Sequence, residues 1–508
     1  MKLPLTKTFS ISYVDQIDTQ NSDLLILTVD EKDIENSTIH NDKLLHLDVT
    51  LGGIIHQLIS FENFKGKWLE TTSSLILNSK IAKRICLLGV GKKSDYLPAR
   101  IREIGIQIAK ISHTFKTNQV LFYSFSQILN SYHNYLSFIE IGFNLGIYKY
   151  PNSNMKDDVK KDLKTPIKLS LVGKNLSTKE TEYINQSINF CRLLQDGPPN
   201  IVTPKYISSH VEDHASKLDI TVSIFGEKKL RELGFNAMLA VSAGSANEPQ
   251  FVVVEYKPKS YKKTLTFVGK GLTMDTGGYS IKTPSTFQEG MKYDMSGAAV
   301  TLSSILAIAQ LKLPIHVYAI GALCENMIDA HSYRVGDIIT SYSGKTIEIL
   351  NTDAEGRVVL SDALHYAAKD LKSDYIVEYS TLTGAMITAL GHTGAGLFCH
   401  NKELEKIVIH ACEMTGDKSH PLPIWEEISD DIKGTISDVC NVSATRGAAG
   451  SISAAAFLNE FVENVPYMHI DIAGVSDNIK AIGYSKSKGS SGYGVQLSVE
   501  IAKIISEK

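Results

Sequence analysis

Residues 347–371 read IEILNTDAEGRVVLSDALHYAAKDL, and this stretch decides the fold class. It begins with a strand-like run at residues 347–350, passes through a polar loop at residues 351–357 and continues into a helical pattern. The apolar residues of that pattern recur at helical spacing and form one face: Leu360, Ala363, Leu364, Ala367, Ala368 and Leu371. A strand that leads through a loop into an amphipathic helix is typical of an α/β protein.

The chain beyond residue 196 repeats this alternation of strands and helices. We expect strands at residues 265–269, 317–323, 376–380 and 469–473. The pattern predicts a mixed, largely parallel sheet that helices cover on both faces, and ligands bind such sheets beyond the carboxyl ends of the strands. The most apolar stretch, residues 298–323, is interrupted by polar residues and proline, which favours a buried helix followed by a buried strand over a membrane span.

A smaller α/β pattern without clear chemistry precedes this part. Strands are expected at residues 24–29, 85–90, 119–123 and 167–172, and a helix at residues 99–111. Polar residues dominate positions 151–164 and 173–179, and a helix over residues 178–194 would end at the Gly and Pro residues of DGPPN, residues 196–200. We therefore predict three parts: an N-terminal domain at residues 1–176, a linker helix at 177–195 and a larger domain at 196–508.

Composition limits the classes of function. The 508 residues are 43% hydrophobic and 21% charged, which is typical of a soluble globular protein with a large core. The net charge of -3 offers no broad field for nucleic acid or an anionic membrane. The six cysteines include no Cys-x-x-Cys pair, and no apolar run of signal-peptide length follows Met1. These features favour a cytoplasmic protein without disulfides.

The loop at residues 351–357 is the first of three acidic segments. If it is extended, Asp353, Glu355 and Arg357 point the same way and present two carboxylates and a guanidinium on one face. That arrangement suits a metal ion beside an anion. The alternative is a capping box, in which Thr352 caps the helix and Glu355 reaches back to the backbone.

The second segment, residues 268–282, follows a predicted strand and carries Lys270, Asp275 and Lys282 among glycines. Its alternative interpretation is a Gly-rich hairpin with solvated lysines. A phosphate-binding loop is excluded, because the glycine that such a loop requires five positions before its Gly-Lys is missing. The third segment, residues 291–299, places Asp294 before a helix, where it could simply favour the helix dipole.

Electrostatics decides what these segments mean if they meet in space. Two carboxylates about 4 Å apart repel by roughly 4 kcal/mol at an effective dielectric constant near 20, so four together need cations. Two divalent ions would balance them. The oxygen-rich set suits Mg²⁺ or Mn²⁺, and a nitrogen donor beside carboxylates also admits Zn²⁺.

The sequence NTDAEGR at residues 351–357 resembles the signature of the leucyl (cytosol) aminopeptidase family. The other matching motifs agree in order and spacing: residues 275–278, Lys282, residues 291–295, 325–327, 380–385, 446–447, 471–474 and 492–495. The resemblance covers nearly everything after Asp196. It implies a dinuclear metallopeptidase that occupies the larger domain and removes N-terminal amino acids, leucine and other mainly hydrophobic residues, from peptides with a free N-terminus.

Family members imply a role for each matching residue. The tighter metal ion would be held by Lys270, Asp275, Asp294 and Glu355, and the exchangeable one by Asp275, Asp353 and Glu355. The ions would be Mn²⁺ or Zn²⁺, with Mg²⁺ an option at the exchangeable site. Lys282 would stabilise the oxyanion, and Arg357 would hold a bicarbonate that serves as general base. Substrate contacts would come from Met291, Asn326, Thr381, Leu382, Thr383, Gly384 and Ala473.

Some positions depart from the family pattern, and alternatives to it exist. Met274, Thr276 and Val335 stand where Phe, Ser and Pro are common, which leaves the preferred substrate open. The resemblance also implies a homohexamer with the catalytic domains inside, where the N-terminal domain would serve assembly or regulation. The alternatives are a two-metal phosphoesterase and an additional DNA-binding regulatory role.

Overall fold

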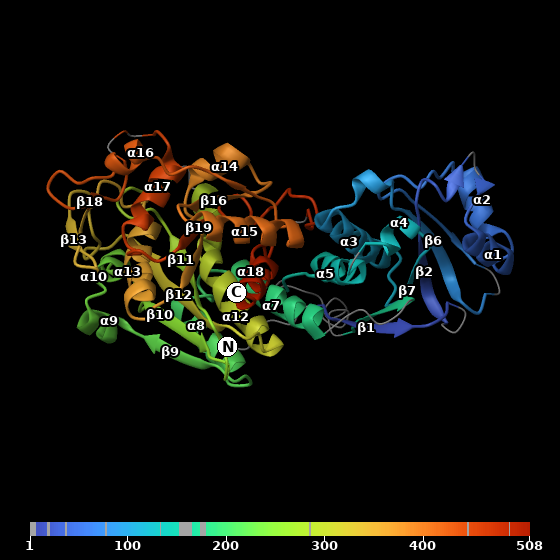
Figure 1. The fold of residues 1–508 in the computed structure, drawn as a ribbon, viewed down its shortest axis with the longest axis horizontal. Helices are drawn as coiled ribbons and strands as arrows, with labels where there is room; N and C mark the ends of the chain where they lie inside the picture. The colour runs from blue at the N-terminus through green and yellow to red at the C-terminus, as the bar shows by residue number, and fades with distance from the viewer. Residues whose placement is uncertain are drawn as a thin grey trace. The chain divides into compact units, whose positions relative to one another are not determined.

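The computed structural model describes residues 7–17, 21–35, 38–76, 79–132, 134–151, 165–172, 179–283, 286–443, 445, 447–486 and 488–508. The chain forms two compact units (Figure 1). The N-terminal unit comprises Pro4–Thr181 with Ile482–Ser485, and the C-terminal unit comprises Glu182–Ala481 with Lys486–Lys508. The predicted boundary near residue 176, the predicted helix start at residue 178 and Arg446 lie outside the described residues, so the predicted division stays a prediction.

A six-stranded sheet organises the N-terminal unit. Its strands lie in the order β1 (Phe9–Val14), β8 (Ile167–Val172), β7 (Gln119–Ser124), β2 (Ser22–Val29), β6 (Ala82–Gly89) and β5 (Thr71–Leu75). All neighbours are parallel except β5, which runs antiparallel to β6. The short elements are β3 (Ile34–Glu35), β4 (Thr38–Ile39), η1 (Lys93–Asp95) and α4 (Gln127–Asn130). The strands predicted in this part of the chain are confirmed.

Successive side chains of a strand point to opposite faces of the sheet, and apolar side chains on both faces of β2 explain how helices cover both sides. Leu24 and Ile26 of β2 pack in one core with helices α3 (Pro98–Thr114) and α5 (Tyr135–Ile147). Leu25 and Leu27 pack in the other core with α1 (Asp42–Thr50) and α2 (Ile54–Phe61). The α/β unit predicted for the first part of the chain is therefore present.

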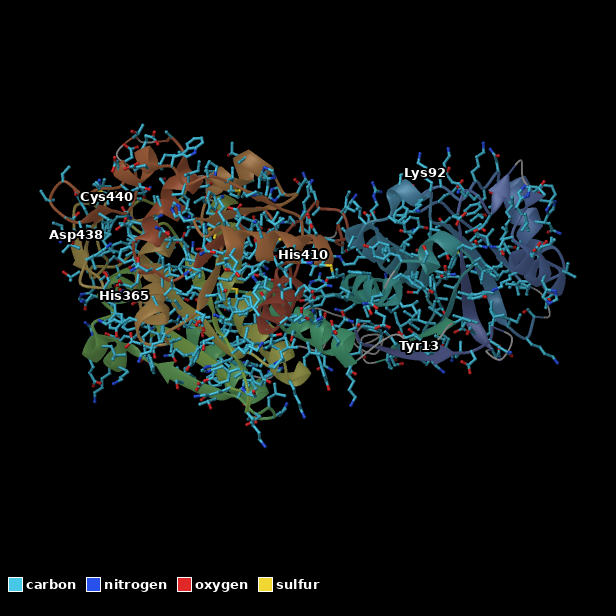
Figure 2. All side chains as sticks on the ribbon, in the orientation of Figure 1. Tyr13, Lys92, His365, His410, Asp438 and Cys440 are labelled. Carbon is cyan, nitrogen blue, oxygen red and sulfur yellow. The ribbon has the colours of Figure 1, made fainter. Side chains whose placement is uncertain are left out.

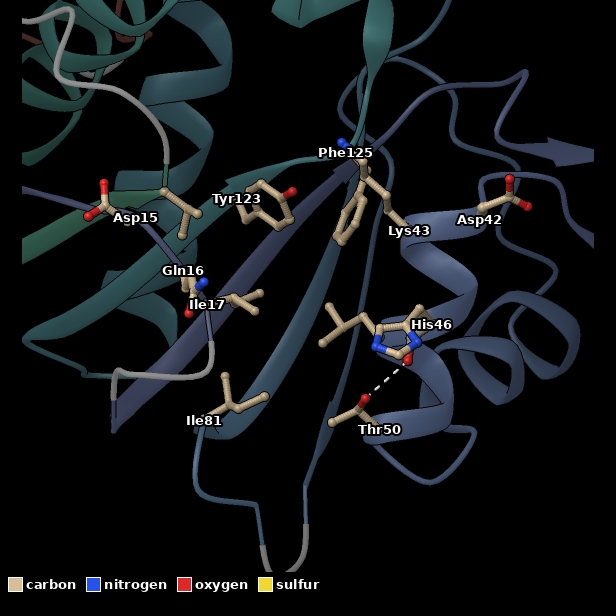
Figure 3. A pocket seen from close by; sticks show the side chains of 12 residues that line it. Asp15, Gln16, Ile17, Asp42, Lys43, His46, Thr50, Ile81, Tyr123 and Phe125 are labelled. Carbon is tan, nitrogen blue, oxygen red and sulfur yellow. Dashed lines mark hydrogen bonds between the residues drawn. The ribbon is translucent and has the colours of Figure 1, made fainter.

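A cavity of about 480 Å³ lies on the α1 face of this sheet (Figure 3). Its floor is apolar and includes Phe125 and Ile81, while Lys43 and His46 of α1 stand exposed at its rim. Residues 15–17 form the opposite wall. The cavity contains none of the predicted site residues.

The C-terminal unit is built on an eight-stranded mixed sheet. Its order is β17 (Ser419–Pro421), β16 (Ala395–Cys399), β19 (Tyr467–Asp471), β15 (Tyr375–Ser380), β11 (Thr264–Asp275), β12 (His316–Asn326), β10 (Gln250–Tyr256) and β9 (Thr221–Phe225). The four central strands, β19, β15, β11 and β12, are parallel to one another. β10 and β16 run antiparallel to the central strands beside them. This arrangement confirms the predicted mixed, largely parallel sheet.

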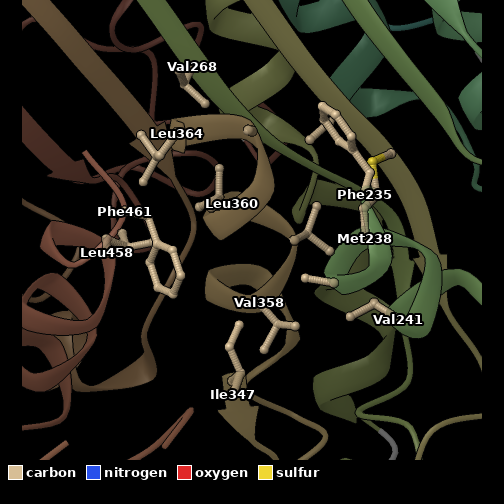
Figure 4. Packing of buried hydrophobic residues seen from close by; sticks show 14 of the residues in the cluster. Phe235, Met238, Val241, Val268, Ile347, Val358, Leu360, Leu364, Leu458 and Phe461 are labelled. Carbon is tan, nitrogen blue, oxygen red and sulfur yellow. The ribbon is translucent and has the colours of Figure 1, made fainter. Parts of the chain in front are cut away.

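Helices cover both faces of this sheet, as predicted. On one face α13 (Glu355–Lys369) packs with α10 (Asn236–Ser242) and α17 (Gly450–Asn459), and Leu360 and Leu364 meet Val268 of β11 (Figure 4). On the other face α12 (Ser296–Leu311) packs with α18 (Val495–Ser506). The remaining helices are α7 (Lys179–Asp196), α8 (Pro204–Ala215), α9 (Glu227–Leu233), α11 (Thr286–Glu289), η2 (Gly290–Tyr293), α14 (Gly384–Leu390), α15 (Lys402–Thr415) and α16 (Glu426–Asp430).

A separate three-stranded sheet contains β14 (Thr346–Glu348), flanked by β13 (Ile338–Thr340) and β18 (Val439–Cys440). The strand predicted at residues 347–350 is therefore present but shorter, and it lies outside the main sheet. Figure 2 labels Cys440, whose thiol lies 3.7 Å from Glu348 on β14. All six cysteines are described and free, which agrees with the expected absence of a disulfide framework.

One helix of the described residues, Gly290–Leu311, is long and apolar enough to cross a membrane by composition. In the structure it is mostly buried inside the C-terminal unit, with 89% of its most apolar window covered. The predicted pair of a buried helix and a buried strand at residues 298–323 is confirmed as α12 and β12.

Gly297 allows α12 to begin directly against the sheet. A Cβ added there would lie 1.9 Å from the Tyr379 carbonyl oxygen and 2.8 Å from the Lys270 amide nitrogen. Because both are backbone atoms, we expect Gly297→Ala to lower the free energy of unfolding by at least about 2 kcal/mol, measured by urea denaturation. Gly290→Ala is the control, since nothing lies within 4 Å of its added Cβ, and equal stability of the two variants would contradict the packing argument.

Candidate active site

Strand β11 carries the first two site residues, Lys270 and Asp275. We expected this segment to follow the strand, but β11 continues to Asp275, so the alternative of a Gly-rich hairpin is wrong for these residues. Side chains alternate along a strand, and residues five apart face opposite sides unless the register changes. The pairing of β11 with β12 shifts between Leu272 and Met274, which turns Asp275 toward the same site as Lys270.

Asp294 reaches this place from the turn before α12. It ends η2, two residues before the helix begins, and its carboxylate lies 2.9 Å from the Lys270 ammonium. Thr381, directly after β15, donates a hydrogen bond of 2.8 Å to the same carboxylate oxygen. The other oxygen, Oδ2, is buried and has no hydrogen-bond partner among the described residues. Asp294 is thus held from two sides with one oxygen available to a further ligand.

The loop at residues 351–354 is not extended, which corrects the predicted geometry. Asp353 lies in a turn, and Glu355 is the first residue of α13. The N-cap residue is Ala354, without a side-chain cap, so the alternative interpretation of this loop as a capping box is wrong. Thr352 instead accepts a hydrogen bond from the Ser280 amide and donates one to the Gly277 carbonyl, which ties this loop to the loop after β11.

The four carboxylates and two lysines form one compact cluster. Asp275, Asp353 and Glu355 each offer an oxygen within 4.8 Å of the others. The Lys270 ammonium lies 2.8 Å from Glu355, and the Lys282 ammonium lies 2.8 Å from Asp275 and also pairs with Asp353. Asp275 is 1% exposed and Asp353 is 31% exposed, so the Asp353 side of the cluster faces the solvent.

Crowding and burial shift the protonation of this cluster. Burial raises the pKa of Asp294 to about 8, because desolvation and the repulsion of Glu355 outweigh the attraction of Lys270. Burial and the charge of Glu355 raise the pKa of Asp353 to about 7. Burial also opposes the ionised form of Glu355, but the two lysines hold its pKa below the usual value. The raised pKa values of Asp294 and Asp353 show that two ammonium groups do not balance four ionised carboxylates. Additional positive charge would stabilise the ionised form of the cluster.

Arg357 lies in the first turn of α13, where it is buried. Burial lowers the pKa of its guanidinium to about 10, against the stabilising charges of Glu355 and Asp471. Its Nε atom is buried and finds no hydrogen-bond partner in the described part of the chain. A buried guanidinium with an unused donor suits an anion.

Besides Asn326 at the end of β12, the predicted substrate-binding residues lie on the segments after β15 and β19 and in η2. Thr381, Leu382 and Thr383 follow β15, and Gly384 begins α14. Ala473 follows β19, while half-buried Met291 lies in η2 beside Asp294. Lys270 donates a hydrogen bond of 3.3 Å to the Thr381 carbonyl, which joins the segment after β15 to the acidic cluster.

Asn326, the last residue of β12, contacts the acidic cluster through Asp275. It is fully buried, and its amide donates hydrogen bonds of 2.8 Å to Asp275 and 3.0 Å to the Thr352 carbonyl. Tyr333 donates to the same carbonyl at 2.7 Å. These contacts hold the carboxylate of Asp275 and the loop that carries Asp353.

Sequence reasoning missed several residues of this support. Tyr333 and Asn441 fix the loop before α13, with Asn441 accepting from the amides of Leu350 and Asn351. Asp471 accepts hydrogen bonds from the segment after β15. No local pattern marks Tyr333 or Asn441, whereas Asp471 stands at a strand end within a matching motif and could have been chosen on that signal.

The residues fit a divalent metal centre. The donor set combines four carboxylates with a lysine nitrogen, and Asp294 Oδ2 is a buried acceptor without a hydrogen-bond partner among the described residues. Unpaired buried acceptors are unfavourable, and cations satisfy them. Lys270, Asp275, Asp294, Asp353 and Glu355 are the side chains that could hold such ions.

Comparisons with known proteins agree with this fold. The catalytic-domain profile of the cytosol aminopeptidase family matches residues 189–499, and its N-terminal-domain profile matches residues 26–156. The probable cytosol aminopeptidase of Buchnera aphidicola subsp. Acyrthosiphon pisum (strain Tuc7) is 36% identical over 497 residues, which cover 95% of each chain. Leucine aminopeptidase 1 of Arabidopsis thaliana is 37% identical over 508 residues, covering 97% of this chain and 95% of that one.

A solved structure of a mutant tomato leucine aminopeptidase matches with a TM-score of 0.86 at 32% identity, covering 98% of this chain and 97% of that chain. Fold and site together define a metal-dependent peptidase. The chain belongs to the cytosol aminopeptidase family, which confirms the resemblance seen in its sequence. It is a hydrolase that acts as an aminopeptidase on peptide substrates.

Proposed function

We propose that this aminopeptidase works with two divalent metal ions in the acidic cluster. Lys270, Asp275, Asp294 and Glu355 would hold one ion, and Asp275, Asp353 and Glu355 the other. The convergence of these side chains within a few ångströms, from three separate segments of the chain, carries the proposal. Lys270 would have to lose its proton to become a ligand, which a divalent cation favours. Mn²⁺ or Zn²⁺ suit this mixed donor set, with Mg²⁺ an option at the solvent-facing position.

Bound ions would supply a Lewis acid for the scissile carbonyl, an acidified water and a place for the free amino group of the substrate. Lys282 stands where its ammonium can donate to the developing oxyanion, because it lies on the more exposed side of the cluster beside Asp353. Arg357 holds an anion with its unused donor, and a bicarbonate at this position would accept a proton from water. Asn326 would orient Asp275 through the hydrogen bond that its amide donates to that carboxylate, and its predicted contact with the substrate stays a prediction.

The substrate's N-terminal residue would lie between the segments that flank the cluster. We assign backbone contacts to residues 381–384 and the side-chain pocket to Met291 and Ala473. Thr383 is buried, whereas the other residues of this set are half-buried or exposed beside the buried acids, which suits a pocket for a hydrophobic side chain. Leucine and other hydrophobic N-terminal residues are the proposed specificity.

The proposals for assembly and location rest on the family resemblance. We propose a homohexamer in the cytoplasm, in which the N-terminal unit serves assembly or regulation. Names of relatives support the location in part, since several are cytosol aminopeptidases and another relative, leucine aminopeptidase 2 of Arabidopsis thaliana, is chloroplastic. A two-metal phosphoesterase finds no support among the relatives.

An assay on leucyl amide and its N-acetylated form tests the proposed function. We expect the purified protein to cleave only the free amine. A chelator should lower kcat/KM by at least about 100-fold, and Mn²⁺ or Zn²⁺ should restore it, because the ions supply several kcal/mol of transition-state stabilisation. Cleavage of the acetylated substrate, or activity that resists chelation, would refute the mechanism.

A further inference from the structure

A column of buried polar side chains runs along one face of strands β15 and β19 toward the active site. The two strands are parallel, with Glu378 opposite His469 and Ser380 opposite Asp471. Residues two apart on a strand share a face, so all four side chains lie on the same side of the sheet. All four are 0% exposed, although the middle of such a sheet is usually apolar. Such polar groups need a structural or functional reason.

Asp471, the last residue of β19, stands at the end of this column nearest the acidic cluster. It connects the segment after β15 to the segment after β19. Its Oδ1 accepts hydrogen bonds from the Leu382 amide at 3.3 Å and from the Ala473 amide at 3.1 Å. Its Oδ2 accepts one from the Thr383 hydroxyl at 2.7 Å. One carboxylate therefore fixes the backbone after β15 relative to the backbone after β19.

Thr383 extends the same link to two helices. Its hydroxyl accepts from the Met386 amide at the start of α14 and lies 2.7 Å from the Ser451 hydroxyl on α17. Asp471 also helps to keep the buried guanidinium of Arg357 charged. A residue in this position controls the shape of the region where the substrate side chain would lie.

We propose that Asp471 is a positioning residue that sets the width of the side-chain pocket by locking residues 382–383 to Ala473. This inference rests on the proposed assignment of these segments to substrate binding. Asp471 acts through Leu382, Thr383 and Ala473 and does not touch the reacting atoms. Its loss should therefore weaken recognition of a large side chain while the metal centre stays intact.

The test compares Asp471→Ala and Asp471→Asn with the unaltered chain. Hydrogen bonds to a buried carboxylate are strong, so Asp471→Ala should raise KM for leucyl amide by about 10- to 100-fold. Asp471→Asn keeps an acceptor for the two amides and should raise KM less. The ratio of kcat/KM for leucyl amide to that for glycyl amide should fall in both variants, since glycine has no side chain to recognise. Metal content per subunit should not change.

Two further variants separate positioning from general stability. Glu378→Gln alters the other end of the column, which is also buried. The Glu378 carboxylate contacts His469 and Tyr467, and among the described residues it makes no hydrogen bond to residues 382–383 or Ala473. It should lower Tm and leave the leucyl-to-glycyl ratio unchanged. Asp374→Asn, before β15 and 40% exposed, should change neither quantity.

Several outcomes would overturn the inference. One is a wild-type KM and a wild-type ratio in folded Asp471→Ala, and another is a loss of metal that accounts for its reduced activity. If Asp471→Ala fails to fold, the test uses Asp471→Asn and Thr383→Val instead. Thr383→Val removes the hydroxyl that donates to Asp471. An unchanged leucyl-to-glycyl ratio of kcat/KM in both variants would then overturn the inference. The unaltered protein is assayed first with free and acetylated leucyl amide, so a failure of the proposed function shows there, independently of Asp471.

Discussion

Glu355→Ala is expected to lower kcat/KM for leucyl amide by at least about 1,000-fold, because the loss of bound metal removes several kcal/mol of transition-state stabilisation. Glu355 is proposed as a ligand of both ions: it lies 2.8 Å from Lys270, and one of its oxygens is within 4.8 Å of oxygens of both Asp275 and Asp353. Removing the Glu355 carboxylate takes one ligand from each of the two proposed metal ions. Steady-state kinetics and elemental analysis of metal per subunit measure the two effects together.

The matched control is Glu413→Ala, which removes a carboxylate that is 73% exposed on α15. It should keep the activity and the metal content of the unaltered protein. Near-normal activity in Glu355→Ala, or loss of activity with both metal ions still bound, would contradict the assignment of Glu355 as a bridging ligand.

Lys282→Ala is expected to lower kcat by about 100- to 1,000-fold, the usual cost of removing one donor to a developing oxyanion. KM and metal content should change little, because Lys282 is not among the proposed ligands. Its ammonium is 15% exposed and pairs with Asp275 and Asp353, so it reaches the cluster from the solvent side. Kinetics with leucyl amide and metal analysis on the same sample test this division of roles.

Lys402→Ala serves as the control for charge alone, since this lysine is 77% exposed and pairs only with a neighbouring glutamate in the described structure. It should behave like the unaltered protein. If Lys282→Ala loses its metal ions, or keeps its full kcat, then Lys282 is part of the metal centre or a bystander, and its proposed role is wrong.

The sequence predicted the order of strands and helices well, because the spacing of apolar residues that indicates each element lies within a short stretch of the chain. Strands cover or overlap the predicted ranges 265–269, 317–323, 376–380 and 469–473, and the last of them runs from Tyr467 to Asp471, two residues earlier than predicted. The convergence of Asp275, Asp294 and Glu355 also followed from the rule that sites form beyond parallel strands, together with the family resemblance.

The local conformation of the site was harder to predict. Thr352 had the spacing of a capping residue, yet its hydroxyl binds Gly277 and Ser280, which are more than seventy residues away. An extended loop would have placed Asp353 and Glu355 on one face, but the helix begins at Glu355. Long-range hydrogen bonds decide both cases, and no window of local sequence contains them.

The pairing of β1 with β8 has a consequence for how the N-terminal unit forms during synthesis. Among the described residues β1 is an edge strand that pairs with β8, and the paired residues Ser12 and Ser170 are 158 positions apart. At ribosomal speed the partner strand arrives on the order of 10 s after β1. During that interval the backbone amides and carbonyls of β1 are exposed to water without a partner strand, so its alternating polar and apolar sequence must resist pairing with other chains until β8 has been synthesised.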